Sequence, residues 1–171
     1  MAKKILLDAR AEPAYFSLIG ISCHLKDYRL SYLLNQQLEF SLSKLDDLPH
    51  PLPGVQEPAE FSYYYYRDED RRQTWSLIAN RSQDAVLIPP LKQTDFLLLV
   101  EGEFRKAQKE EVLHSIRIIP NVLTAFEVSL SEVRNPEILL TDIEMHLMKV
   151  FTRNRNKYQP KLKSTGGSDH V

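Results

Sequence analysis

The chain has a single cysteine, Cys23, among its 171 residues. One cysteine excludes an intramolecular disulfide framework and is typical of proteins in a reducing compartment, so we expect a cytoplasmic protein. Glycine is also scarce, with 5 residues in the whole chain. Phosphate loops and dinucleotide-binding turns need several glycines at a fixed spacing, and the sequence contains no such pattern.

Long apolar runs are missing as well. Near the N-terminus only residues 5–7 are consecutively apolar, which is too short for the core of a secretion signal. No window approaches the roughly 18 apolar residues of a membrane-spanning helix. The formal net charge of −1 gives no overall attraction to nucleic acid or anionic lipid. We therefore expect a soluble protein that uses neither a membrane nor nucleic acid as a partner.

The remaining composition is that of an ordinary globular domain. Hydrophobic residues make up 43% and charged residues 26% of the chain, enough for one sizeable core. We predict a single α+β domain over residues 1–152. The stretch 153–171 is polar and basic and lacks apolar periodicity, so we predict a disordered tail there.

Apolar periodicity predicts two strand–helix–strand units. The expected elements are a strand at 15–21, a helix at 25–38 and a strand at 39–45, then a strand at 94–101, a helix at 103–118 and a strand at 122–130. The strand at 94–101 is apolar almost throughout, which favours a central position with both faces buried. Residues 3–7 are predicted to form a short strand or an arm docked on the sheet.

The segment between the two units is predicted to add a proline-rich loop and a hairpin. The loop, 47–59, carries four prolines and is either a stiff surface connection or a ligand for an aromatic groove. Residues 61–67 and 71–80 are expected to pair as a hairpin. A further strand at 85–88 is expected to end at Pro89 and Pro90, which remove two backbone donors.

These elements predict an α+β fold built on an open, mostly antiparallel sheet. We expect helices packed on one face, in a ferredoxin-like or ACT-like arrangement with an inserted hairpin. A terminal helix at about 142–152 is expected from the capping-box spacing of Thr141 and Glu144.

The run of four tyrosines, 63–66, is the most unusual feature of the sequence. Side chains alternate along a strand, so Tyr64 and Tyr66 must lie on the face opposite Tyr63. With helices on one face only, Tyr64 and Tyr66 are expected to be exposed beside Arg67 and to contact a protein partner or a second copy of the chain. Stacking of single-stranded nucleic acid is less favoured, because acidic residues 68–70 cancel the nearby positive charge.

Three polar residues are candidates for a ligand site or for structural roles. Asp27 and Arg29 lie near the start of the first helix, where they either hold a ligand or, in the case of Asp27, favour the positive end of the helix dipole. Asp95 opens the central strand. A buried carboxylate there needs a partner, and it acts either as an anchor for the Pro89–Pro90 turn or as a general base.

No cofactor or metal site is predicted. The five histidines are scattered, with no pair at helical ligand spacing and no neighbouring cysteine pair. Cys23 precedes His24, which invites a thiol nucleophile, but a lone cysteine is usually packed as a small hydrophobe. We predict no catalytic residue.

Two segments together resemble a known group of sequences. The segment 18–35, LIGISCHLKDYRLSYLLN, resembles the amino-terminal signature of the small bacterial IPExxxVDY proteins. The segment 88–96, IPPLKQTDF, stands in the place of their naming motif: Ile88, Pro89 and Asp95 agree, whereas Pro90, Thr94 and Phe96 replace Glu, Val and Tyr. The resemblance implies a bacterial protein with a similar order of elements from about 4 to 140 and brings no established activity.

The sequence leaves three classes of function open. The first is a non-catalytic interaction or regulatory module that acts through an exposed aromatic sheet face. The second is an ACT-like domain that binds a small ligand at a sheet–helix junction or between subunits. The third is an enzyme, for which the sequence offers no constellation of residues.

Overall fold

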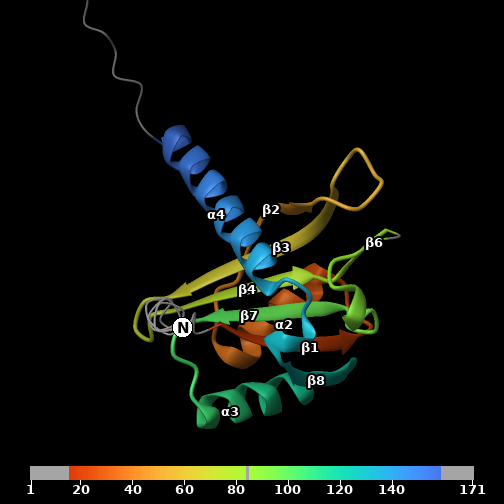
Figure 1. The fold of residues 1–171 in the computed structure, drawn as a ribbon. Helices are drawn as coiled ribbons and strands as arrows, with labels where there is room; N and C mark the ends of the chain where they lie inside the picture. The colour runs from red at the N-terminus through yellow and green to blue at the C-terminus, as the bar shows by residue number, and fades with distance from the viewer. Residues whose placement is uncertain (1–15, 84, 159–171) are drawn as a thin grey trace, which may run out of the picture.

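The protein has an α+β fold with an open antiparallel sheet (Figure 1), as the sequence predicts. The computed structural model describes residues 16–83 and 85–158, and within them the fold has six main strands and three α-helices. The strand or arm predicted at 3–7 and residues 159–171 of the predicted tail lie outside the described residues.

The elements follow the predicted order. The six main strands are β1 (Phe16–Cys23), β2 (Ser43–His50), β3 (Ala59–Asp68), β4 (Gln73–Ala79), β7 (Phe96–Glu101) and β8 (Val122–Val128). The helices are α2 (Asp27–Leu38), α3 (Lys106–Arg117) and α4 (Pro136–Tyr158). The short elements are β5 (Arg81–Ser82), β6 (Ala85–Val86) and the 3₁₀ turns η1 (Pro89–Leu91) and η2 (Leu130–Glu132).

The sheet has the order β2-β3-β4-β7-β1-β8, and each neighbouring pair is antiparallel. Strand β7 is central, as predicted: Leu98 is fully buried and lies opposite Ile19 of β1 and Leu77 of β4. The order β8-β1-β7 is that of a ferredoxin-like core. The hairpin β3–β4 is inserted next to β7 and moves β2 out to the edge of the sheet.

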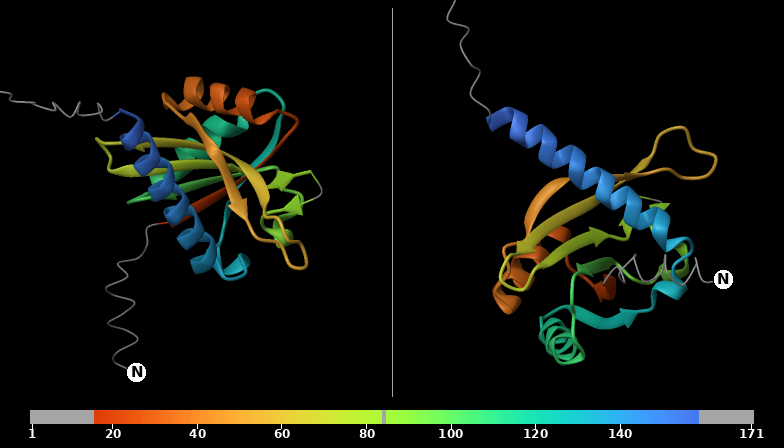
Figure 2. Two further views of the ribbon diagram at one scale, coloured as in Figure 1. Left: turned by 90° about the horizontal axis from the view of Figure 1, so that it is seen from above. Right: turned by 60° about the vertical axis from the view of Figure 1, so that its left-hand side comes forward.

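Both faces of the sheet are covered, which corrects the prediction that helices pack on one face only. On one face, Leu30 and Leu34 of α2 and Ile116 of α3 belong to a core with Trp75 and Leu98 of the sheet. On the other face, α4 lies across the strands (Figure 2) and its residues join a second core. The central strands carry apolar side chains on both faces, so each face needs its own cover.

Strand β2 begins and ends later than predicted. Asn35 at the end of α2 holds Leu42 on both sides: its Oδ1 accepts from the Leu42 N–H at 2.8 Å, and its Nδ2 donates to the Leu42 carbonyl at 3.1 Å. The ladder therefore starts at Ser43. The strand continues through Pro49, because an edge strand tolerates a missing N–H. The loop predicted at 47–59 is correspondingly shorter.

Helix α4 is also longer than predicted. It begins at Pro136 rather than near residue 142, since proline fits the first turn of a helix, where its missing N–H is not needed. It ends at Tyr158, so a tail that starts at residue 153 is wrong. An ion pair of 2.6 Å between Arg153 Nη2 and Asp46 Oδ2 joins this end of the helix to β2.

Candidate functional site

The tyrosines predicted to form an exposed face are largely enclosed. Tyr64 is only 7% exposed and packs in the core beneath α2. Tyr66 is half-buried, with its ring centroid 5.1 Å from that of Phe40. The prediction of an exposed aromatic surface is therefore wrong. Arg67 is exposed, but its Nη1 donates to Thr74 Oγ1 at 3.0 Å, a contact made within the sheet.

Asp27 sits in a polar cluster where α2 meets β2 and β3. Its Oδ2 accepts from Ser62 Oγ at 2.5 Å and from the Tyr64 hydroxyl at 3.3 Å, and Lys44 Nζ lies 3.7 Å away. Burial alone would raise the pKa of the Asp27 carboxyl, but the hydrogen bonds and the Lys44 charge outweigh it and lower the pKa. Arg29 lies apart, exposed on α2 with its guanidinium 5.7 Å from the Tyr32 ring centroid.

Asp95 holds the end of β1 in place. Its Oδ2 accepts from the Cys23 N–H at 2.9 Å, where the β1–β8 register shifts, and its Oδ1 lies 3.5 Å from Arg81 Nε. Cys23 itself is buried, and this burial raises the pKa of its thiol, which disfavours the thiolate that a nucleophile needs. The side chain of Asp95 therefore contacts the end of β1 and Arg81, and not the Pro89–Pro90 turn that it was expected to anchor.

Sequence reasoning overlooked Asn80, the polar residue that organises the loop after β4. Its side chain is fully buried, its Nδ2 donates to the carbonyls of Leu91 and Thr94 at 2.9 Å, and its Oδ1 accepts from the Ile88 N–H at 2.9 Å. The available signal was an asparagine directly after an apolar strand and before a turn, a position typical of side-chain-to-backbone bonding.

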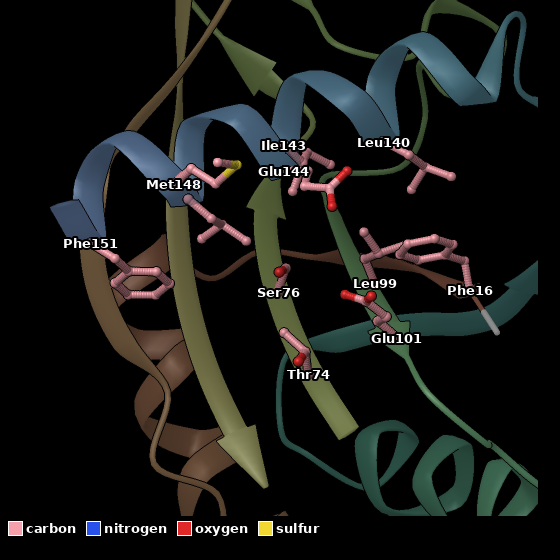
Figure 3. A pocket seen from close by; sticks show the side chains of 11 residues that line it. Phe16, Thr74, Ser76, Leu99, Glu101, Leu140, Ile143, Glu144, Met148 and Phe151 are labelled. Atoms are coloured by element: carbon pink, nitrogen blue, oxygen red, sulfur yellow. The ribbon is translucent and has the colours of Figure 1, made fainter. Parts of the chain in front are cut away.

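A hollow of about 160 Å³ lies between α4 and the sheet (Figure 3). Its walls are mainly apolar, with four polar residues among them. The residues that line it are Phe16, Thr74, Ser76, Leu99, Glu101, Leu140, Ile143, Glu144, Leu147, Met148 and Phe151. Figure 3 shows that the α4 side chains face those of β4 and β7 across this space. The hollow therefore lies at a sheet–helix junction.

The outer side of α4 carries a second feature, which we call the α4 seam. It consists of Ile138, Thr141, Met145, Met148 and Thr152, all exposed and spaced alternately three and four residues apart. Such spacing places side chains on one face of a helix. Met145 and Met148 are 51% and 66% exposed, which is high for apolar side chains on a helix that is otherwise packed.

The seam lies on the side of α4 opposite the one fixed to the sheet, with Met148 at its margin, where it also lines the hollow. Ile143 and Val150 are buried, and His146 between them is held at two points. Its Nε2 lies 2.8 Å from the Asp46 carbonyl oxygen, and its ring contacts that of Tyr63 edge-on, with centroids 5.8 Å apart. These contacts determine the rotation of α4 about its axis and so the direction of the seam.

Two other kinds of site are absent from the described residues. Within 16–83 and 85–158, no group of three or more histidine, cysteine or carboxylate side chains is arranged to hold a metal ion. No helix in the part of the chain that the structure describes combines the length and apolarity needed to cross a bilayer.

Comparisons with known proteins identify no relative. No protein-family model, no curated protein and no solved structure matches this chain. Its function must therefore be inferred from its own contacts and surfaces.

Proposed function

We propose that this protein is a non-catalytic interaction module that binds another protein chain through the α4 seam. The observation that carries the proposal is the alternating three-and-four spacing of exposed residues opposite the buried side of α4. That pattern is the one by which helices pair in coiled coils. Exposed methionines suit such a surface, because their flexible thioether side chains adapt to a partner.

This surface replaces the aromatic face that the sequence suggested. Tyr64 and Tyr66 pack against elements of the same chain, whereas more than half of the surface of Met145 and of Met148 is exposed. A protein partner thus remains the proposal, at a different place on the molecule.

A non-catalytic role is supported by the state of the titratable groups. The pKa of the Asp27 carboxyl is lowered by contacts within the cluster that joins α2 to the sheet. The pKa values of the Tyr63 hydroxyl and the Cys23 thiol are raised mainly by burial in the core. Each shift thus has a cause in the packing of the chain and calls for no substrate.

The test is site-specific photocrosslinking in the native cell. A photoreactive residue at Met145 should give a discrete crosslinked product, because the seam is covered by its partner. The matched control is the same residue at Tyr28, which is 63% exposed on α2 at the other face of the sheet. Equal labelling at both positions, or no product from Met145, would refute the proposal.

A second candidate function is favoured by the hollow beneath α4. At about 160 Å³ it is close to the size of the roughly 150 Å³ cavity of an engineered protein that binds benzene. Glu101 and Glu144 contribute carboxylates to its lining, so we propose a small apolar molecule with an ammonium group as the ligand. Benzylamine should then raise the melting temperature more than toluene does. The effect should be lost in Leu140→Phe, which narrows the hollow.

We also propose kinship with the IPExxxVDY proteins. Two motif positions that agree with that family have clear roles here: Ile88 is buried and bonded to Asn80, and Asp95 accepts from the Cys23 N–H. The structure of a family member should show the same strand order, with β7 between β1 and β4. A different order would refute the kinship.

A further inference from the structure

We infer that the partner of the α4 seam is a second copy of this chain, bound with the two α4 helices antiparallel. This inference rests on the proposed function and specifies its partner. It predicts a twofold axis that passes between Met145 and Met148. In such an interface the same surface of both subunits is used, so the surface must complement itself. The seam and its flanking charges meet that condition.

The seam residues pair well in this register. An axis between Met145 and Met148 places Met145 opposite the partner's Met148 and Thr141 opposite the partner's Thr152. Ile138 then lies opposite the partner's Arg155, whose aliphatic stem can cover it while the guanidinium extends to the flank of the seam. Each exposed apolar residue of the seam thus lies opposite an apolar side chain or the aliphatic part of one.

The charges along α4 point to the antiparallel direction. Exposed or half-buried acidic residues, among them Glu137 and Asp142, lie in the first half of the helix. Basic residues, among them Lys149 and Arg155, lie in the second half. A parallel pair would place like charges together, whereas an antiparallel pair brings each acidic half against a basic half.

The flanks of the seam agree with this direction residue by residue. By helical periodicity, Glu137 and Arg155 lie on one flank and Asp142 and Lys149 on the other. In an antiparallel pair related by a twofold axis, each flank meets the same flank of the partner. Glu137 therefore approaches the partner's Arg155, and Asp142 approaches the partner's Lys149. Each pair departs by one or two residues from the exact pairing that the methionines set.

Most of these charges have no other partner in the described part of the chain. No ion pair of Glu137, Lys149 or Arg155 is formed there, and Asp142 Oδ2 lies 3.7 Å from His50 Nδ1. No described element lies over the outer side of α4 in either view of Figure 2. Two copies can therefore approach along their seams with their sheets on the outside.

The first experiment exchanges the charges of the full-length chain. One variant combines Glu137→Lys with Asp142→Lys, and the other combines Lys149→Glu with Arg155→Glu. A single helix pair makes a small interface, so sedimentation velocity should extend to roughly 500 micromolar, a concentration at which weak contacts associate. The wild type should dimerise. Each variant alone should associate at least about tenfold more weakly, since like charges now face each other.

Mixing the two variants gives the decisive result. An equimolar mixture should restore dimerisation, because a basic α4 then pairs with an acidic one. The control is Arg105→Glu with Lys106→Glu at the start of α3, which should dimerise like the wild type. Melting curves check that each variant is folded. Unchanged self-association of the variants, or no recovery on mixing, would overturn the inference.

The register has its own test. Under mild oxidation, Met145→Cys mixed with Met148→Cys should form a crosslinked heterodimer faster than Met145→Cys forms a homodimer. Cys23 is buried and common to all samples. A faster Met145→Cys homodimer would contradict the proposed axis. If the wild type is monomeric and the photoreactive residue at Met145 crosslinks to a different protein, this inference is wrong but the proposed function stands. If that residue gives no crosslink at all, both are wrong.

Discussion

Buried polar side chains hold the irregular parts of this protein, and Asn80 is the clearest example. Three backbone groups of the loop at 88–94 bond to its side chain. Asn80→Ala leaves the Ile88 N–H and the Thr94 carbonyl without their side-chain partner, each at a cost of about 1–3 kcal/mol, whereas the Leu91 carbonyl still accepts from the Thr94 N–H at 2.8 Å. We expect the free energy of unfolding to fall by at least about 2 kcal/mol, as measured by chemical denaturation.

The control for this change is Gln37→Ala on the exposed side of α2, which should alter stability by less than about 0.5 kcal/mol. Equal midpoints for Asn80→Ala and the wild type would show that the loop is held by something other than Asn80.

Asp27 should make stability depend on pH. Its pKa is lower in the folded chain than its ordinary value, so the carboxylate stabilises the fold at pH values above the unfolded pKa of about 3.9. This contribution is lost as the pH falls through the folded pKa. Asp27→Asn should therefore be less stable than the wild type at neutral pH, and the difference should shrink on acidification. Asp70→Asn, at an exposed turn, should show no such trend.

At the scale of elements, α2 depends on its inward face. Leu34 is fully buried against the sheet, and truncation of such a leucine usually costs about 2–5 kcal/mol. Leu34→Ala should lower the denaturation midpoint accordingly. Leu123→Ala, on the exposed side of β8, is the matched control and should leave the midpoint nearly unchanged. If the denaturation midpoint fell by a similar amount in both variants, burial of the leucine would not explain the loss of stability.

Periodicity predicted most elements, because it reports directly on burial. The hairpin β3–β4 and the central position of β7 follow from alternation and from an unbroken apolar run. The boundaries depend on contacts that are distant or specific. The start of β2 is determined by the side chain of Asn35, and the end of α4 is held by Asp46 of β2.

The candidate site was harder to predict than the fold. Alternation shows that Tyr63 and Tyr64 lie on opposite faces, but it does not show what covers either face. What covers the sheet depended on the position of α4. That helix contacts the sheet through His146, whose bonding partner, Asp46, lies 100 residues earlier in the chain. The exposed methionines could be identified only after that contact had determined which side of α4 faces outward.

At the scale of the whole molecule, the middle of the sheet should be its most stable part. Strand β7 is paired on both sides and covered on both faces, whereas β2 is paired on one side only. Amide hydrogens exchange slowly where opening requires unfolding of the core. Native-state exchange should therefore be slowest in β7 and faster in β2 and the short β5–β6 pair. Protection of β2 amides equal to that of β7 would contradict this layout.

The inserted hairpin has a consequence for the order in which the chain folds. Among the described residues, strand β1 pairs with β7 and β8 alone, so Phe16 lacks its partner until Glu101 has been synthesised, and Leu18 waits also for Val128. Strand β2 pairs, within the same residues, with β3 alone. The β3–β4 hairpin needs only contacts close in sequence, whereas closing long loops is slow. On the ribosome, the inserted β3–β4 hairpin can therefore form before β1, the first strand, pairs with its neighbours in the sheet.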